Sequence, residues 1–170
     1  VKVDIFITTN GTLLDDEKKK WFNAHKEKIN LIMSVDGRND VQKGNRGCNS
    51  SDLPIMWMIE TMPNYLLSMT VSRKALPNFA DELIYFHEQN YRIDAKPAQG
   101  EDWQAGDGKI YEDQLNKLAD YYLAHPNVTP MYIFKEASYI HLLNNEPNEK
   151  YGKACGIMDE LVAYDVEGRM

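Results

Sequence analysis

Polar residues that could hold a ligand follow two predicted strands of this sequence, each directly after an apolar run. The first group is Thr8-Thr9-Asn10-Gly11-Thr12, and the second is Ser34-Val35-Asp36-Gly37, with Arg46 beyond it. Hydroxyl, amide, carboxylate and guanidinium groups bind polar ligands through hydrogen bonds and charge. The alternative for each group alone is ordinary turn formation, because Asn-Gly and Asp-Gly are common turn dipeptides. Their occurrence on consecutive strands favours a binding site.

The sequence lacks the short motifs of several common enzyme classes. It contains no Walker A loop, GxSxG elbow, HExxH pair or CxxC pair. Gly106-Asp107-Gly108 lacks the third glycine of a dinucleotide-binding loop and does not follow a predicted strand. Lone histidines are more often surface or packing residues than ligands. We interpret all four histidines in that way: His25, His87, His125 and His141.

The composition is that of a globular protein. Of the 170 residues, 43% are hydrophobic and 26% are charged, which excludes disordered and fibrous classes. No run of about 18 apolar residues is present, so we expect no membrane partner. The net charge of −7 disfavours nucleic acid as a partner. Two cysteines, Cys48 and Cys155, cannot form a disulfide scaffold, which favours a reducing, cytoplasmic location.

Strands and helices alternate through the first two-thirds of the sequence. Strand starts near positions 3, 29, 66 and 91 match βα units of about 30 residues and predict a parallel sheet. Four such units form half a barrel or a small doubly wound sheet, and both bind ligands at the carboxyl ends of their strands. The predicted strands are Val3–Ile7, Ile29–Val35, Leu66–Ser72 and Tyr91–Lys96; helices are expected behind Asp15 and Ser51 and over Ala75–Gln89 and Ile110–Ala124, and Arg38–Ser51 is expected to be irregular.

The sequence after residue 126 breaks this pattern. Asn127–Phe134 is interpreted as a possible fifth strand and Lys135–Leu143 as a short helix. We therefore expect a partial barrel over 1–143, and a linker with the start of a second domain over 144–170. The first residues read as the middle of a strand and the last as one strand of a hairpin. We accordingly expect the chain to be an internal piece of a longer protein.

The two strand-end groups resemble the radical S-adenosylmethionine (radical SAM) enzymes, and within them the anaerobic sulfatase-maturating and peptide-modifying branch. That branch carries a TNG-T-L-L segment after one barrel strand, an S-[IV]-D-G strand end, and an arginine at a set distance from the glycine. This sequence has Thr9 to Leu14 as TNGTLL, Ser34 to Gly37 as SVDG, and Arg46 at the matching distance. Gln42-Lys43 stands where the family commonly has a His-Asp pair. The segment from Cys155 to Arg169 resembles the opening of a SPASM-type auxiliary-cluster domain.

The resemblance implies an α/β fold: a partial (β/α) barrel of parallel strands, with the start of an auxiliary-cluster hairpin. It implies that the parent protein cleaves S-adenosylmethionine (AdoMet) reductively with [4Fe–4S] clusters and modifies a peptide or protein side chain. Arg46 would pair with the AdoMet carboxylate, and Ser34 would hydrogen-bond its ribose or amino-acid portion. Asp36 would accept from a ribose hydroxyl or lock the loop. Cys155 would bind an auxiliary cluster in the full-length protein. The implied cofactor-binding residues are Thr9, Asn10, Gly11, Ser34, Asp36 and Arg46; no catalytic residue is assigned.

The CxxxCxxC loop that holds the AdoMet-cleaving cluster in that family is absent from these residues. We therefore expect this piece alone to bind neither AdoMet nor a cluster and to be inactive. One alternative is a cluster-free half barrel that binds a peptide without catalysis, and the presence of CxxxCxxC in the parent reading frame would separate it from the enzyme. A small doubly wound nucleotide-binding domain is a third hypothesis. The edge strand Val3–Ile7 would lack a neighbour, which predicts self-association through exposed sheet edges.

Overall fold

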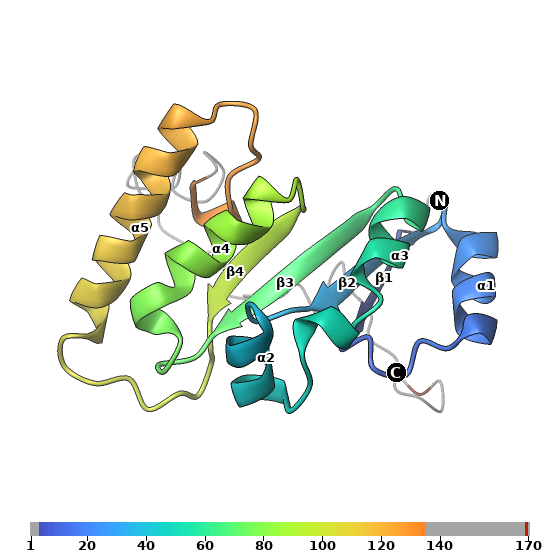
Figure 1. Cartoon of the computed structure of the whole chain (residues 1–170), viewed down its shortest axis with the longest axis horizontal. Coiled ribbons are helices and arrows are strands. Elements are labelled where there is room, and N and C mark those ends of the chain that lie inside the picture. The colour runs from blue at the N-terminus through green and yellow to red at the C-terminus, as the bar shows by residue number, and fades with distance from the viewer. Residues whose placement is uncertain (1–3, 135–168, 170) are drawn as a thin grey trace. The chain divides into compact units, whose positions relative to one another are not determined.

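Four parallel strands and the helices between them make up the part of the chain that the structure describes (Figure 1). A computed structural model of the chain describes residues 4–134 and 169. The chain divides into two units, 1–134 and 135–170; the predicted boundary after residue 143 and the predicted features behind it lie outside the described residues. The elements are β1 (Ile5–Thr9), α1 (Asp16–His25), β2 (Ile29–Ser34), α2 (Asn39–Arg46), η1 (Ser50–Asp52), α3 (Ile55–Thr61), β3 (Tyr65–Val71), η2 (Leu76–Asn78), α4 (Phe79–Glu88), β4 (Ile93–Pro97), α5 (Asp107–Ala124) and η3 (Tyr132–Phe134).

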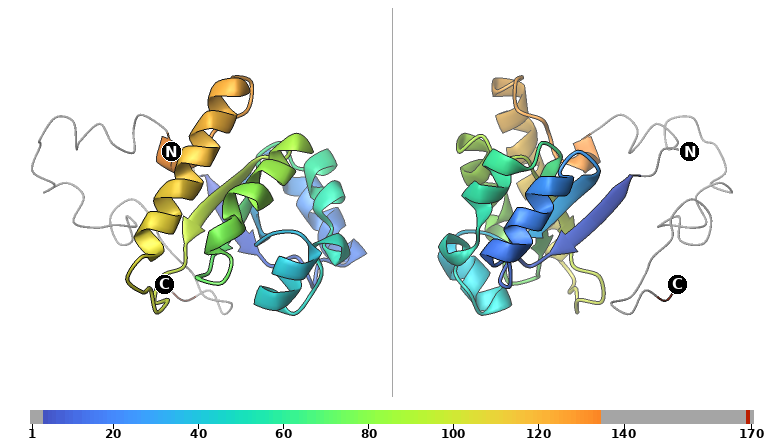
Figure 2. Two further views of the ribbon diagram at one scale, coloured as in Figure 1. Left: turned by 60° about the vertical axis from the view of Figure 1, so that its left-hand side comes forward. Right: turned by 90° about the vertical axis from the view of Figure 1, so that its right-hand side faces the viewer.

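The order of the strands decides between the two predicted architectures. The sheet runs β1-β2-β3-β4, and each neighbouring pair is parallel. The helices α1 to α5 cover one face of this sheet (Figures 1 and 2). A doubly wound sheet would reverse its strand order at a switch point and carry helices on both faces. The described residues therefore form consecutive units of a (β/α) barrel, which confirms the predicted fold class.

The core lies between the sheet and its helices. Along β2 and β3 every second side chain is buried, including Leu31, Met33 and Leu67, and the side chains between them are less buried. Phe79 of α4 and Leu118 of α5 are fully buried in the same core. Burying a large apolar side chain contributes about 1.5–3 kcal/mol, so this layer attaches the helices to the sheet. The residues between the buried ones point to the other face of the sheet.

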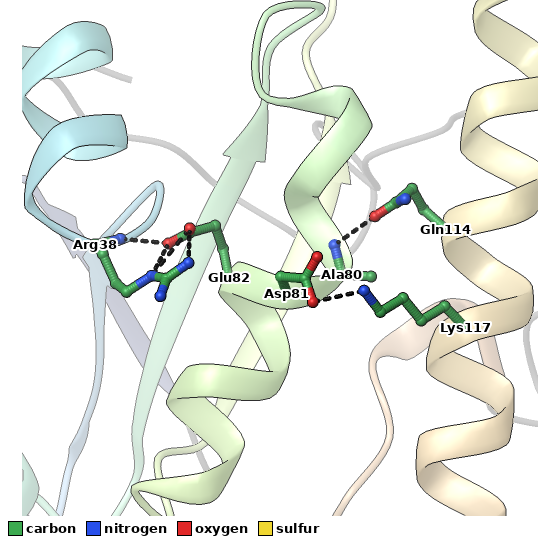
Figure 3. Close-up of polar contacts among 6 residues, drawn as sticks. All are labelled: Arg38, Ala80, Asp81, Glu82, Gln114 and Lys117. Carbon is green, nitrogen blue, oxygen red and sulfur yellow. Dashed lines mark hydrogen bonds and ion pairs between the residues drawn. The ribbon is translucent and has the colours of Figure 1, made fainter.

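Polar contacts fix α4 against α5 (Figure 3). The backbone N–H of Ala80 donates to Oε1 of Gln114 at 3.1 Å, and Lys117 Nζ lies 2.6 Å from Asp81 Oδ1. Both members of the ion pair are nearly half exposed, so the pair contributes little free energy. Its effect is to set the alignment of the two helices.

His87 is a packing residue, in agreement with its interpretation from the sequence. Its side chain is buried, and Nε2 lies 3.0 Å from Oη of Tyr122, which also accepts from the N–H of Met131 at 3.2 Å. Burial lowers the pKa of His87, and it raises the pKa of Tyr122 to about 12. The cluster joins α4, α5 and the segment behind α5.

We expect the domain to lose stability as the pH falls from about 7.5 to 5, in part through His87. The folded state holds the pKa of His87 below its ordinary value of 6.5, so in this range the unfolded chain binds more protons than the folded one. Stability contributed by the neutral side chain is therefore present above the unfolded pKa and is lost as the pH falls through it. Urea unfolding at several pH values measures this slope. The His87→Gln variant should show a shallower slope, and an equal slope would remove His87 as its source.

Two predicted segments are wrong. The stretch Arg38–Ser51, expected to be irregular, contains the helix α2 and the short helix η1. Asn127–Phe134, interpreted as a possible strand, forms no strand and ends in the short helix η3. In both, tertiary contacts replace local propensity: Gln42 of α2 is fully buried, and the N–H of Tyr132 donates to Oδ1 of Asp94 at 2.8 Å.

The strand β1 lies at an edge of the sheet and pairs only with β2 among the described strands. It covers Ile5–Thr9 and so extends beyond the predicted end at Ile7, while the predicted start at Val3 lies outside the described residues. Ile5 and Phe6 are 44% and 60% exposed. Self-association through this edge stays a prediction.

Within residues 4–134, no helix combines the length and apolarity that a membrane span requires.

Candidate functional site

The predicted site residues gather at the carboxyl end of the sheet. Thr9 pairs with Met33 in the β1–β2 register, so Asn10 follows at the level of Ser34. Ser34 pairs with Ser68 of β3. Asp36 and Arg46 lie close behind the end of β2, because Arg46 at the end of α2 contacts Asp36 directly. The structure thus places the strand-end residues that the sequence singled out at the same end of the sheet.

The turn after β1 uses its own polar side chains. Thr9 Oγ1 accepts a hydrogen bond from the N–H of Gly11 at 3.1 Å, and Asn10 Oδ1 accepts from the N–H and the hydroxyl of Thr12 at 3.2 and 2.9 Å. Gly11 has a φ of +78°, and a Cβ there would lie 3.0 Å from Sδ of Met33. These contacts are ordinary turn chemistry. A cofactor-binding role for Thr9, Asn10 and Gly11 stays a prediction.

The carboxylate of Asp36 is held by several hydrogen bonds from neighbouring elements. It is 4% exposed, and its carboxylate accepts four hydrogen bonds. Arg46 donates through Nε at 2.8 Å and Nη2 at 3.0 Å, the N–H of Thr70 donates at 3.0 Å, and Asn45 Nδ2 lies at 3.4 Å. A paired carboxylate in this position joins the end of β2, the end of α2 and β3. Asp36 therefore holds the site together, and a direct contact with a cofactor stays a prediction.

The helix α2 is anchored to Asp36 through Gln42 as well as through Arg46. Gln42 Oε1 accepts from the N–H of Asp36 at 2.7 Å, and Gln42 Nε2 lies 3.7 Å from Sγ of Cys48. Gly47 ends the helix in the left-handed conformation with a φ of 76°, its N–H bonded to the carbonyl of Lys43, as C-terminal glycines commonly do. Gln42, which stands where the resembled family has histidine, is thus a structural residue here.

Arg46 is committed within the protein. Its bidentate pair with Asp36 uses two of the five guanidinium N–H groups, and the side chain remains 29% exposed. Its predicted contact with a cofactor carboxylate would have to use the remaining groups, and much of its charge is already balanced. That contact stays a prediction.

A second ion pair, between Arg38 and Glu82, attaches the loop after β2 to α4 (Figure 3). Glu82 of α4 is buried and accepts from the backbone N–H of Arg38 at 2.6 Å and from Nη2 of Arg38 at 2.7 Å. The hydrogen bonds from Arg38 to Glu82 raise the pKa of Arg38, which keeps the pair charged. Arg38 also lies over the ring of Tyr85, 5.3 Å from its centroid. The loop is therefore tied to α4 as well as to β3.

A third pair lies behind β3 and β4. Arg73 Nε lies 2.8 Å from Oδ2 of Asp107, which also accepts from the N–H of Gln104 at 2.7 Å. The backbone hydrogen bond from Gln104 is the main cause of the lowered pKa of Asp107, and Arg73 adds to it. This pair fixes the start of α5 at the same end of the sheet. Sequence reasoning missed it because the two residues are far apart in the chain.

The sheet face away from the helices carries polar residues that sequence reasoning also missed. The register places Ser34, Ser68 and Asp94 in one row across β2, β3 and β4, and Thr70 and Lys96 in the next row toward the carboxyl end. Their partners along each strand, such as Met69 and Ala95, are buried on the helical side. The signal in the sequence is the alternation of polar and apolar residues over the third and fourth strands.

The described residues do not fit an iron–sulfur cluster, which needs three or four cysteine thiolates or equivalent ligands. Among them Cys48 is the single cysteine, and residues 4–134 contain no group of three His, Cys, Asp or Glu side chains that could hold a metal ion. Cys155 lies outside the described residues. The site as described can bind a polar organic ligand through hydrogen bonds and charge.

A groove of about 930 Å³ lies on the helical side, between α1, α2, α3 and α4. Trp57, Tyr85 and Tyr91 line it, together with Arg38. It opens on the face opposite to Ser34 and Ser68, so it is separate from the strand-end site.

Comparisons with known proteins agree with the geometry at the level of fold. The described part of the chain has the fold of a partial radical SAM barrel, and the structures that show this are of anSMEcpe, a radical SAM anaerobic sulfatase-maturating enzyme. Hexahistidine-tagged anSMEcpe with bound AdoMet is 18% identical with a TM-score of 0.62, and native anSMEcpe with bound AdoMet and Kp18Cys peptide is 14% identical with a TM-score of 0.64. Each match covers 82% of this chain and 43% of the other.

This chain thus spans less than half the length of the anSMEcpe chains that it matches. No family model matches the sequence, and no curated protein matches it either. The resemblance drawn from the TNGTLL and SVDG segments is confirmed by the fold.

Proposed function

We propose that this chain is part of a radical SAM enzyme that binds AdoMet at the carboxyl end of the sheet and modifies a peptide or protein side chain, as in sulfatase maturation. One observation carries the proposal: Asn10, Ser34 and Asp36 belong to the two motifs of that branch and lie together at the ligand-binding end of a sheet with that fold. The structurally similar anSMEcpe has been solved with AdoMet and with peptides. A cytoplasmic location belongs to the same proposal.

The residues of the chain would bind and orient AdoMet. The hydroxyl of Ser34, which has no hydrogen bond to another described residue, can donate to or accept from the ribose or amino-acid portion. Asp36 and Arg46 hold the loop that carries it, and the turn at Gly11 lets the backbone approach closely. In such enzymes the cluster supplies the reductive cleavage of AdoMet, and the protein supplies orientation. Because residues 4–134 do not fit a cluster, its ligands must come from other residues.

Calorimetric titration with AdoMet of the natural polypeptide that contains this chain tests the binding step. We expect saturable binding that the Ser34→Ala variant weakens about fivefold, because a lost hydrogen bond costs about 1 kcal/mol. Ser51→Ala, which removes an exposed hydroxyl from η1 on the helical side, is the matched control and should leave the affinity unchanged. Equal affinities for both variants and the unaltered chain would remove Ser34 from the site.

The catalytic part needs the natural polypeptide that contains this chain. After anaerobic reconstitution with iron and sulfide it should turn brown and cleave AdoMet when reduced, whereas the 170-residue chain should stay colourless. A parent that binds a peptide but neither a cluster nor AdoMet would replace the proposal with a cluster-free binding module.

A further inference from the structure

Cations at the ligand end of the sheet differ in whether the protein already balances their charge. Arg46 is paired with Asp36, Arg38 with Glu82, and Arg73 with Asp107. Each of these carboxylates is buried or nearly so, and each pair ties two elements together. The three arginines therefore serve mainly to hold the loops, and an anionic ligand would gain little from their charge.

Lys96 is different. It lies in β4, it is exposed, and its register partner is Thr70 of β3. Because Ile93 and Ala95 of the same strand are buried under the helices, the alternation of a strand places Lys96 on the opposite sheet face. Within the described part of the chain its ammonium makes no ion pair or hydrogen bond.

Two hydroxyl groups of β3 lie on one side of Lys96. Thr70 lies directly across from Lys96, and Ser68 lies one row toward the amino end. Neither hydroxyl has a hydrogen bond to another described residue. The acid on this face is Asp94, beside Ser68, and one of its oxygens accepts from the N–H of Tyr132 at 2.8 Å. An ammonium with hydroxyls on one side is suited to a carboxylate, since it offers three donors around a compact charge.

We infer that Lys96, with Thr70 and Ser68, forms a carboxylate-binding subsite on the open face of the sheet. The inference rests on the proposed function, for which it names a contact with the ligand. Lys96 lies two strands from Ser34, or about 10 Å, so one ligand of AdoMet size or two adjacent ligands could reach both. The carboxylate belongs to the amino-acid portion of AdoMet or to an acidic side chain of the peptide, and the experiment separates these sources.

Reductive methylation with ¹³C-formaldehyde keeps lysine charges and gives each lysine an NMR signal. We label the natural polypeptide that contains this chain and titrate it with AdoMet, with N-acetyl-glutamate methylamide, and with N-acetyl-glutamine methylamide as the neutral control. The Lys96 signal, assigned from the Lys96→Arg variant, should shift saturably with a carboxylate ligand and not with the amide. Lys74 is exposed on the helical side near Gly44, and its signal is the internal control.

A shift with AdoMet assigns the carboxylate to the cofactor, and a shift with the glutamate compound assigns it to the peptide. The Lys96→Met variant should weaken the responding ligand about tenfold, as expected for a lost charge-assisted hydrogen bond, while Lys96→Arg should largely retain it. No shift with either carboxylate, or equal shifts at Lys74, would overturn the subsite. If AdoMet binding depends on Ser34 but neither AdoMet nor the glutamate compound shifts the Lys96 signal, the proposed function is retained and the subsite is overturned.

Discussion

Replacing Gly37 with alanine should destabilise the domain by about 3 kcal/mol, because the new methyl group has no room and the backbone is strained. Gly37 has a φ of +152°, and a Cβ there would lie 2.8 Å from Cβ and 2.9 Å from Cγ1 of Val41. The third neighbour is Oε2 of Glu82 at 3.0 Å, the oxygen that accepts from Arg38. The methyl group would therefore push α2 away from α4 and disturb an ion pair at once.

Urea unfolding followed by circular dichroism measures the loss. Gly47→Ala is the matched control, because Gly47 also has a positive φ, of 76°, but has nothing within 4 Å of its would-be Cβ. That variant should lose only about 1 kcal/mol from backbone strain. Gly108→Ala, in the first turn of α5 and also in open space, should be neutral or slightly stabilising. Equal losses for Gly37→Ala and Gly47→Ala would show that the close packing around Gly37 contributes nothing.

Replacing Asp36 with alanine should cost about 3 kcal/mol, because it leaves a partly buried arginine and a backbone N–H without their acceptor. Removing one member of a buried pair costs about 3–5 kcal/mol. The lower end applies here, since Arg46 keeps 29% exposure and can turn toward water. The same change frees the N–H of Thr70 and releases α2 from the end of β2, so affinity for AdoMet should fall with stability.

A double-mutant cycle separates the pair from the packing around it. The Asp36→Ala/Arg46→Ala variant should lose less than the sum of the two single variants, because the second change removes the uncompensated charge. Asp102→Ala, in an exposed loop, is the control and should change stability by no more than about 0.5 kcal/mol. Strict additivity would contradict the coupling that the distances of 2.8 and 3.0 Å between these side chains indicate.

The four strands could be predicted because their signal is local. The sequence shows each strand as a short β-rich run between turn residues. In the structure, buried and less buried residues alternate along β2 and β3. Asp15, predicted to stand at the start of a helix, accepts from the N–H of Lys18 at 2.9 Å and caps the amino end of α1. These features depend on residues a few positions apart, so the sequence predicts them, although the bounds of individual strands shift by up to two residues.

The helix α2 could not be predicted in this way. Its sequence, Asn-Asp-Val-Gln-Lys-Gly-Asn-Arg, contains a glycine and two asparagines and little apolar periodicity. It is helical because Gln42 and Arg46 are held by Asp36 and because Arg38 before it is held by Glu82. Contacts across the fold provide the stability that intrinsic propensity does not.

The sequence by itself determined the parallel βα order, the turns at Gly11 and Gly37, and the set of polar residues at the strand ends. Only the tertiary structure decided which of those residues pair with each other. Arg46 has the same charge in the sequence whether it binds Asp36 or a cofactor, and Lys96 resembles any lysine at the end of a strand. Pairing and register join residues dozens of positions apart, and the free energy of an ion pair depends on the burial that such contacts create.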